Sequence, residues 1–472
     1  MARRDALVAV RTVSPPQRAG RAARAPADPP YVRDHHALLE DPDLAVASAA
    51  ALAEGQRARR LVFGERPLCA SLRPNLVPKG AYERIRRVAE TLYGALGRLE
   101  RALLEEEVLR RELDLDPEEE RLALADPGFK ASSPAARLDG FVGADGVIRF
   151  VEYNAESPAG MAYNDELVAV FDGLPVTAAF RRRWRIRAVP LRRHQLAVML
   201  RAYAGRTPER PAIAIVDWHG LPTLTEFEMF QRSFEESGMR TVICAPQELE
   251  LRRDRLYARG ERVHLVYRRV LTSELLVRPD IAAPLVNAYL KGAVAVVNSF
   301  RAKLLHKKMS LALLSDDRYE RLYTAAQRAA IATHIPWTRK VREGHTTYRG
   351  KLADLADLVL RHRESFVLKP NDEYGGKGVV LGWTVDAREW EQTFLAALTS
   401  SYVVQERVDV QRQAFPVLLE SVHFLDLAVD HDPYLFWGRA RGNLCRLSSS
   451  ALLNVTAGDG SVVPTYLVEG RA

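Results

Sequence analysis

A glycine-rich segment at residues 366–382, FVLKPNDEYGGKGVVLG, limits the possible folds of this chain more than any other feature. Its apolar ends predict two strands joined by a loop, and the first strand ends in Lys369. The glycines let backbone amides approach an anion closely, and Lys369 and Lys377 add positive charge. No helix opens with Gly-Lys-Ser/Thr, so this is not the phosphate loop of P-loop NTPases. The segment favours a nucleotide phosphate site; the alternative is an ordinary glycine hairpin.

Lysine is rare in this chain: only 10 of its 68 basic residues are lysine. Half of them fall within two short windows, 298–310 and 366–378. These five are Lys303, Lys307, Lys308, Lys369 and Lys377. Because arginine presents a planar fork and lysine a compact point charge, the clustering suggests that these positions need an ammonium group.

Two polar motifs flank a turn at residues 144–146. They are Arg137-Leu-Asp139 and Glu152-Tyr-Asn154, and strand alternation places all four polar side chains on one face of a predicted hairpin. Two carboxylates and an amide oxygen are ligands that Mg²⁺ with nucleotide phosphates prefers, and the arginine can neutralise charge on a transferring phosphoryl group. The alternative is a surface salt bridge across a hairpin.

The region after residue 210 predicts a βαβ unit. A strand at 212–217, a helix at about 224–237 and a strand at 241–244 follow one another. Parallel sheets bind ligands at the carboxyl ends of their strands, where His219 and Thr223 lie in the first loop. We expect these two residues to contact substrate; the alternative is a plain N-capped helix.

The rest of the chain is less specific. The pattern predicts helices over residues 34–112, and a further helix that begins within residues 303–314. Residues 335–410 alternate strands with a helix at Leu352–His362, and strands and loops follow residue 415.

Composition excludes several functional classes. At 472 residues the chain is too long for one core, so packed subdomains are expected. The net charge of +8 is spread along the chain without a stacking aromatic module, which makes nucleic-acid binding unlikely. Its 3 cysteines are widely separated, so neither a disulfide framework nor a zinc site is indicated, and a cytoplasmic location is expected. No apolar run approaches the ~18 residues of a membrane span.

Taken together, these motifs and Asn298-Ser299 resemble those of the glutathionylspermidine synthetase-like, circularly permuted ATP-grasp proteins. The resemblance runs from about residue 137 to residue 465. In that family the metal-binding hairpin precedes the nucleotide-binding lid in sequence. The resemblance implies an α/β ATP-grasp fold, here with an N-terminal helical region and a Rossmann-like βαβ subdomain.

The resemblance also implies roles for single residues. Asp139, Glu152 and Asn154 would hold Mg²⁺, and Arg137 would stabilise the transition state of acyl-phosphate formation. Residues 405–408 would form the adenine-binding hinge. The residues expected to bind ATP are Lys308, Lys369, Tyr374, Gly375, Gly376, Lys377, Gly378, Gln405, Glu406 and Val408.

Other polar residues leave alternatives open. Arg446 would hold phosphate or a substrate carboxylate, or else belong to a structural strand pair. Asp426 and Asn454 could form a competing metal set, although the hairpin set is preferred because its ligands cluster. Glu156 is a candidate for receiving a cationic amine. Arg268 could meet an acidic substrate, with a solvated surface cation as the alternative.

We therefore expect an ATP- and Mg²⁺-dependent ligase that joins a small-molecule or peptide carboxylate to an amine through an acyl phosphate. The alternatives are a phosphotransferase on the same fold and an inactive nucleotide-binding partner protein. Substrate identity and oligomeric state stay open. The expected segments are a disordered basic N-terminus (1–33), helices with the metal hairpin (34–205), a substrate-binding α/β subdomain (206–300), a lid (301–410) and the rest of the catalytic sheet (411–472).

Overall fold

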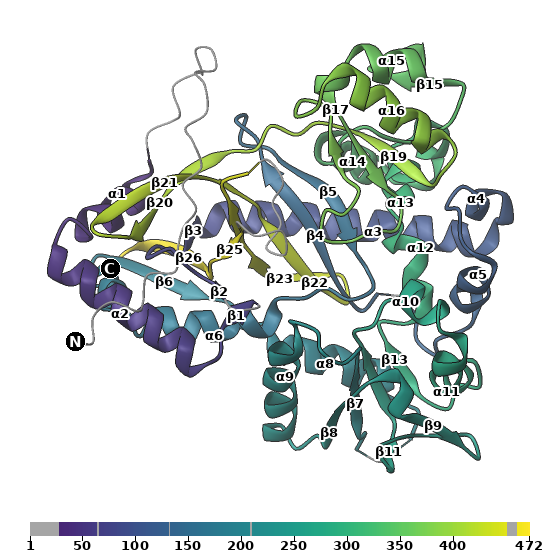
Figure 1. Ribbon diagram of the computed structural model, residues 1–472, viewed down its shortest axis with the longest axis horizontal. Coiled ribbons are helices and arrows are strands. Elements are labelled where there is room, and N and C mark those ends of the chain that lie inside the picture. Colours follow the sequence, from purple (N-terminus) through teal and green to yellow (C-terminus); the bar gives the residue numbers. More distant parts are fainter. Residues whose placement is uncertain (1–27, 64–65, 132, 208–209, 451–459) are drawn as a thin grey trace.

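A four-stranded antiparallel sheet, in the order β23-β22-β4-β5, lies at the centre of the computed structural model (Figure 1). The structure describes residues 28–63, 66–131, 133–207, 210–450 and 460–472. Two strands form the predicted hairpin, and two C-terminal strands complete the sheet. The four are β4 (Ala135–Val142), β5 (Ile148–Asn154), β22 (Asp432–Phe436) and β23 (Arg439–Leu444). Segments far apart in the sequence are therefore neighbours at the centre of the fold.

Helix α3 (Lys79–Glu105) covers this sheet. Its apolar residues recur at helical spacing, and Leu92, Leu96, Leu99 and Leu103 are buried in the core where the helix contacts β22 and β23. Two short helices follow α3 in the sequence: α4 (Glu107–Arg111) and α5 (Pro117–Leu124).

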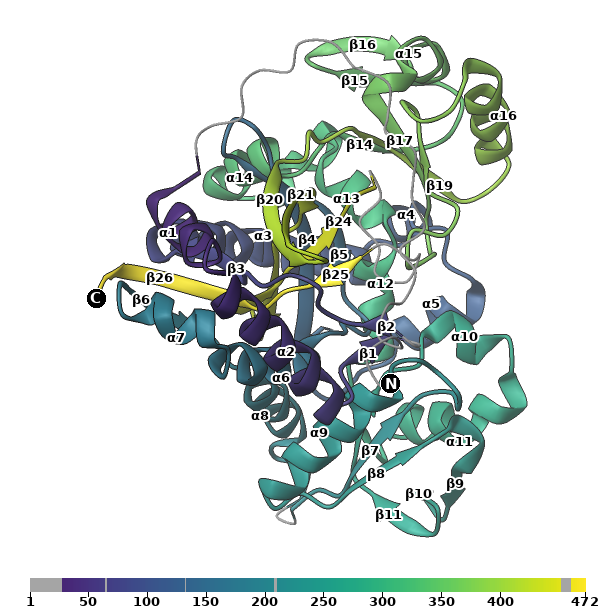
Figure 2. The same cartoon turned by 60° about the vertical axis from the view of Figure 1, so that its left-hand side comes forward.

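Two further sheets enlarge the central body (Figure 2). Their strand orders are β20-β21-β24-β25 and β3-β26-β6. The strands are β20 (Arg412–Leu418), β21 (Val422–Val429), β24 (Arg446–Ser448), β25 (Ser461–Val462), β3 (Asn75–Pro78), β26 (Thr465–Arg471) and β6 (Trp184–Ala188). Helices α1 (Pro30–Leu38), α2 (Pro42–Ala58), α6 (Met161–Asp172) and α7 (Pro175–Arg181) pack around them, and α8 (Arg192–Tyr203) contacts β22 of the central sheet. A small hairpin, β1 (Val62–Phe63) and β2 (Arg66–Pro67), and β3 interrupt the segment predicted to be wholly helical.

The N-terminal segment predicted to be disordered lies mostly outside the described residues. Helix α1 nevertheless begins at Pro30, inside that predicted segment, because a proline at the first helical turn lacks only an N–H that the helix does not need. Among the described residues, no helix is long and apolar enough to cross a membrane. Cys69, Cys244 and Cys445 are buried free thiols.

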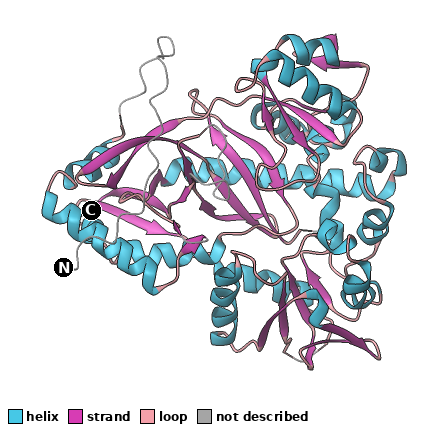
Figure 3. Ribbon diagram, viewed as in Figure 1, coloured by secondary structure: helices cyan, strands magenta, loops and turns pink. Residues whose placement is uncertain are grey.

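The predicted βαβ unit forms a parallel sheet with the order β13-β12-β7-β8 (Figure 3). Alternate side chains of β7 enter different cores: Ile213 and Ile215 on one face, Ala214 and Val216 on the other. The elements are β7 (Ile213–Val216), α9 (Leu224–Glu236), β8 (Thr241–Cys244), β12 (Leu265–Arg268), α10 (Thr272–Leu276), α11 (Pro279–Leu290) and β13 (Ala295–Val297), with an antiparallel meander of β9 (Leu249–Arg252), β10 (Arg255–Ala258) and β11 (Glu261–Val263) between β8 and β12.

A separate small unit follows helices α12 (Lys303–His306), α13 (Met309–Leu314) and α14 (Ala325–His334). It has its own core, built around Phe366, Leu368, Trp390 and Phe394. Its elements are β14 (Thr338–Lys340), β15 (His345–Tyr348), β16 (Lys351–Asp354), α15 (Leu355–Arg361), β17 (Phe366–Pro370), β18 (Val380–Leu381), α16 (Ala387–Leu398) and β19 (Tyr402–Glu406).

One helix start in this unit was predicted wrongly. The helix expected from Leu352 begins at Leu355, because residues up to Asp354 pair with β15. The Asp354 side chain accepts a hydrogen bond from the backbone N–H of Asp357 and so caps the helix. Leu352 is exposed on the strand.

Candidate nucleotide and metal site

The hairpin register brings the four predicted polar side chains together. Arg137 lies opposite Asn154, and Asp139 lies opposite Glu152, so all four share one face. Arg137 Nε lies 2.6 Å from Asp139 Oδ1, and its Nη2 lies 2.8 Å from Oδ2. Burial opposes the charged form of Asp139, but Arg137 and then Arg446 outweigh it and lower the pKa of Asp139 to about 2. Asp139 is therefore an anion at neutral pH.

Two lysines face this hairpin from outside the sheet. Lys369, on β17, donates to Gln405 Oε1 over 2.7 Å and to the Val151 carbonyl over 3.2 Å. Burial is the main cause that lowers the pKa of Lys369 to about 8. Lys308 Nζ donates to the Glu373 carbonyl and lies 3.5 Å from Glu152 Oε1. Both ammonium groups therefore sit near the hairpin carboxylates.

A cavity of about 160 Å³ is lined by the hairpin, the two lysines and the glycine-rich loop. Apolar side chains of Val367, Val379, Leu381 and Trp383 line it together with the polar groups. The residues predicted for the site that line this cavity are Asp139, Glu152, Lys308, Lys369, Gly375, Gly376, Gln405, Glu406, Val408 and Arg446. One space thus offers an apolar wall and a cluster of charges.

The glycine-rich loop needs glycine at several positions. Gly375, Gly376 and Gly378 have φ of 65°, 75° and 69°, which side-chain-bearing residues rarely adopt. Tyr374 is 55% exposed, and its hydroxyl donates to Glu274 Oε1 of α10 over 3.3 Å. Lys377 is 76% exposed, pairs with the neighbouring Glu373 and does not line the cavity.

Arg446 reaches the hairpin from β24, and two acidic residues missed by sequence reasoning hold it. Its Nη2 lies 2.8 Å from Asp139 Oδ2 and 2.9 Å from Asp432 Oδ2, and its Nε donates to Asp430. Asp430 and Asp432 have no exposed surface. Alternation of two acids within the apolar run Leu427-Ala-Val-Asp-His-Asp-Pro-Tyr-Leu was a signal for inward-facing carboxylates.

The donor set of the hairpin fits a hard cation. Asp139, Glu152 and Asn154 supply carboxylate and amide oxygens from one face, and Glu152 is 27% exposed on the cavity side. In the part of the chain that the structure describes, no group of three or more His, Cys, Asp and Glu side chains is arranged to hold a metal. The hairpin set supplies two carboxylates and one amide oxygen instead.

The competing metal set is not supported. Asp426 lies on β21, where its side chain is 70% exposed and pairs with Arg412. The carboxylates in the C-terminal region that contact Arg446 are instead those of Asp430 and Asp432. Asn454 lies outside the described residues.

The predicted substrate-binding residues lie apart from the cavity. Glu156 and Arg268 form a fully buried ion pair at 3.0 Å, so a substrate would reach them only by displacing this contact. His219 is exposed in the loop after β7 and lies 3.0 Å from Glu248. Thr223 is the N-cap residue of α9, and its side chain makes no capping bond. Substrate contact by these residues stays a prediction.

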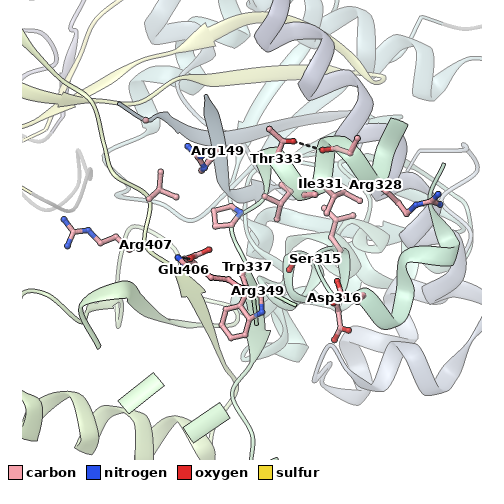
Figure 4. A pocket seen from close by; sticks show the side chains of 18 of the residues that line it. Arg149, Ser315, Asp316, Arg328, Ile331, Thr333, Trp337, Arg349, Glu406 and Arg407 are labelled. Atoms are coloured by element: carbon pink, nitrogen blue, oxygen red, sulfur yellow. Dashed lines mark hydrogen bonds and ion pairs between the residues drawn. The ribbon is translucent and has the colours of Figure 1, made fainter. Parts of the chain in front are cut away.

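A larger cavity, of about 1030 Å³, lies beside residues 405–408, the predicted hinge (Figure 4). Trp337, Arg349 and Arg407 line it, and it shares Glu406 with the smaller cavity. Its charges are largely paired, as in the contact of Arg349 with Glu406 at 2.8 Å. None of the predicted metal ligands or phosphate-facing lysines borders it. The smaller cavity is therefore the candidate site, despite its size.

Comparisons with known proteins agree with this geometry. The model of the circularly permuted ATP-grasp type 2 family matches residues 82–447. No curated protein sequence matches the chain. Among solved structures, a glutathione synthetase-like effector (GSS30) from Globodera pallida in apo form aligns with a TM-score of 0.58 and 13% identity over 92% of this chain and 99% of that one. That likeness shows the shared fold. D-cycloserine synthetase DcsG aligns with a TM-score of only 0.27 and 13% identity, over 55% of this chain and 91% of that one.

Proposed function

Because this chain belongs to the circularly permuted ATP-grasp type 2 family, and so to the ATP-dependent ligases, we propose that it activates a carboxylate as an acyl phosphate and joins it to an amine. One observation carries the proposal: Asp139 and Glu152, from the hairpin face that also carries Arg137 and Asn154, line one cavity together with Lys308 and Lys369. The apolar side chains of the cavity are suited to pack against the adenine base, and the lysines are suited to bind the phosphates. A protein that only bound nucleotide would not need these four hairpin side chains.

In this proposal ATP lies between the hairpin and the lid, the unit at residues 335–410. Adenine packs against Val367, Leu381 and Trp383, and the hinge backbone at 405–408 meets its edge. The phosphates then extend towards Lys369 and Lys308. Because the cavity is smaller than the ~300–1,000 Å³ of most ligand sites, the lid must move outwards to admit ATP.

Asp139, Glu152 and Asn154 would hold Mg²⁺, which supplies positive charge to the nucleotide phosphates when bound. The chain's own residues orient the reactants. Arg137, whose guanidinium is held by Asp139 and by the Ala159 carbonyl at 2.9 Å, would add positive charge behind Asp139, near the phosphoryl group being transferred.

The proposed reaction has two steps. A substrate carboxylate oxygen attacks the γ-phosphorus of ATP, the bond to the β-phosphate oxygen breaks, and ADP leaves. An amine then attacks the carbonyl carbon of the acyl phosphate, inorganic phosphate departs, and the amine loses a proton to solvent as the amide forms. Positioning and charge neutralisation account for most of the rate in such a site.

Thermal melting with Mg-ATP tests the nucleotide site first. A ligand at 100 times its dissociation constant stabilises a protein by about 2.7 kcal/mol, so wild type should melt at a clearly higher temperature with Mg-ATP. Lys369→Ala should lose most of this shift. Lys351→Ala, at an exposed position of the same lid, is the matched control and should keep it. No shift in wild type at millimolar Mg-ATP would refute the proposed function.

A further inference from the structure

The position of Arg446 is fixed by two residues that do not themselves border the cavity. Asp430 accepts hydrogen bonds from both the Arg446 backbone N–H and its Nε, and the Asp430 N–H donates back to the Arg446 carbonyl over 3.2 Å. Asp432 holds the Nη2 edge of the guanidinium at 2.9 Å. Both carboxylates are fully buried, whereas Arg446 keeps 19% of its side chain exposed and lines the cavity.

Asp432 also fixes the hairpin relative to this arginine. Its Oδ1 accepts from the Gly140 N–H over 3.1 Å, at the point where the β4–β5 register shifts between Asp139 and Gly140. Arg446 Nη2 in turn contacts Asp139. The same carboxylate therefore sets the distance between Arg446 and the proposed metal ligand.

We infer that Asp430 and Asp432 are positioning residues that aim Arg446 at the terminal phosphate of bound ATP. This inference rests on the proposed function. Within the described part of the chain, Nε and Nη2 of Arg446 have partners and Nη1 has none, so one edge of the guanidinium is left for a ligand. A guanidinium held in advance stabilises developing charge without reorganising first.

Stability alone does not explain this arrangement. Three carboxylates, those of Asp139, Asp430 and Asp432, surround one guanidinium, although an apolar strand pair of similar volume would cost less to bury. Of the three, Asp139 also pairs with Arg137, whereas Asp430 makes its side-chain contacts to Arg446. We therefore attribute the arrangement to its effect on Arg446: the carboxylates fix the orientation of the guanidinium.

The test compares the affinities of Mg-ADP and of Mg-bound adenylyl imidodiphosphate, a non-hydrolysable ATP analogue, by titration calorimetry. The ratio of the two affinities reports the contribution of the terminal phosphate to binding. Both affinities are measured on the same variant, so a smaller fraction of folded protein affects both equally and cancels in the ratio. Wild type should prefer the analogue. Arg446→Ala should lower the preference at least about tenfold, as expected for a charge-assisted contact to phosphate. Asp430→Asn and Asp432→Asn should each lower it by about threefold or more, whereas Asp426→Asn, on the same C-terminal strands but exposed, should leave it unchanged.

A double variant separates aiming from folding. If Asp430 acts through Arg446, Asp430→Asn should lower the preference no further in the Arg446→Ala background. The inference is overturned if the aspartate variants keep the wild-type preference, if their losses add to that of Arg446→Ala, if wild type binds both nucleotides equally, or if both aspartate variants fail to fold while Arg446→Ala folds. Failure of wild type to bind either nucleotide would overturn the proposed function as well, and so differs from every other outcome.

Discussion

The side chain of Asn298 pairs with both backbone polar groups of Ala135: Oδ1 accepts from the N–H over 3.1 Å, and Nδ2 donates to the carbonyl over 2.6 Å. Nδ2 also lies 2.7 Å from the Ala155 carbonyl and 3.0 Å from that of Glu156. Ala135 begins the hairpin and Ala155 follows its end, so one buried amide fastens both ends of the β4–β5 hairpin to the α/β subdomain.

Replacing this amide should destabilise the protein. Asn298→Ala leaves several buried backbone groups without partners, so the free energy of unfolding should fall by about 2–4 kcal/mol. Denaturant titration measures the loss. Asn287→Ala, on the exposed face of α11, is the control and should stay within about 0.5 kcal/mol of wild type. Equal stability of the two variants would mean that the amide does not fasten the hairpin.

The two lysines of the glycine-rich segment should differ in importance. Lys369 is held inside the cavity, whereas Lys377 is exposed and pairs with its neighbour Glu373. Lys369→Ala should therefore weaken Mg-ATP binding by at least about tenfold, and Lys377→Ala by less than about threefold, because exposed ion pairs contribute little. Equilibrium binding of a fluorescent ATP analogue measures both. A larger effect at Lys377 would indicate that the loop closes further over the phosphates than it does here.

Nucleotide binding should be linked to proton uptake above pH 8. Burial lowers the pKa of Lys369 from 10.5 to about 8, so the folded protein binds fewer protons at this group than the unfolded chain between these values. For this group alone, stability therefore rises as the pH increases from about 8 to 10.5. Phosphate beside Lys369 would favour the charged form and raise its pKa again.

At pH 9, calorimetric heats of Mg-ATP binding should consequently vary with the ionisation enthalpy of the buffer, with a net uptake of up to one proton. Lys351→Met, which leaves Lys369 in place, should behave like wild type. Lys369→Met should show no uptake in whatever binding it retains. Heats that are independent of the buffer in wild type would contradict phosphate contact by Lys369.

Arg268 should matter for folding whether or not substrate meets it. It is fully buried, pairs with Glu156 and donates to the carbonyls of Asn298, Val270 and Ser299. Arg268→Met removes the arginine partner of the buried Glu156 carboxylate and leaves Lys303 at 3.4 Å as its nearest cation, so we expect a loss of about 3–5 kcal/mol in unfolding free energy. Arg255→Met, exposed on β10, is the control. A stable Arg268→Met protein with impaired turnover would instead favour the predicted substrate contact.

The elements of this site that could be predicted from sequence are those with a local signal. Alternation placed Arg137, Asp139, Glu152 and Asn154 on one face, because hairpin partners lie close in sequence. The fold class came from the family resemblance that these motifs carry. The lysine clustering pointed to Lys308 and Lys369, which do lie on one cavity.

Features that depend on distant pairing could not be predicted in this way. Asp430 and Asp432 join the site only because β22 pairs with β4, and no local pattern states that register. The same limit applies to Arg268. Its sequence context is typical of a surface cation, and only the fold places Glu156 beside it in a buried ion pair. Lys377 was predicted from the same glycine-rich segment as Lys369. In the structure its side chain is exposed to solvent and pairs with Glu373.

The most direct test of the central claim is the fate of a carboxylate oxygen. Wild-type protein is incubated with Mg-ATP, amines and a panel of carboxylates whose oxygens carry a heavy isotope, and the released phosphate is analysed by mass spectrometry. An acyl-phosphate route predicts one heavy oxygen in each phosphate released with amide, and at least about a hundredfold less labelled phosphate with Arg137→Ala. Amide formation with unlabelled phosphate would contradict the account.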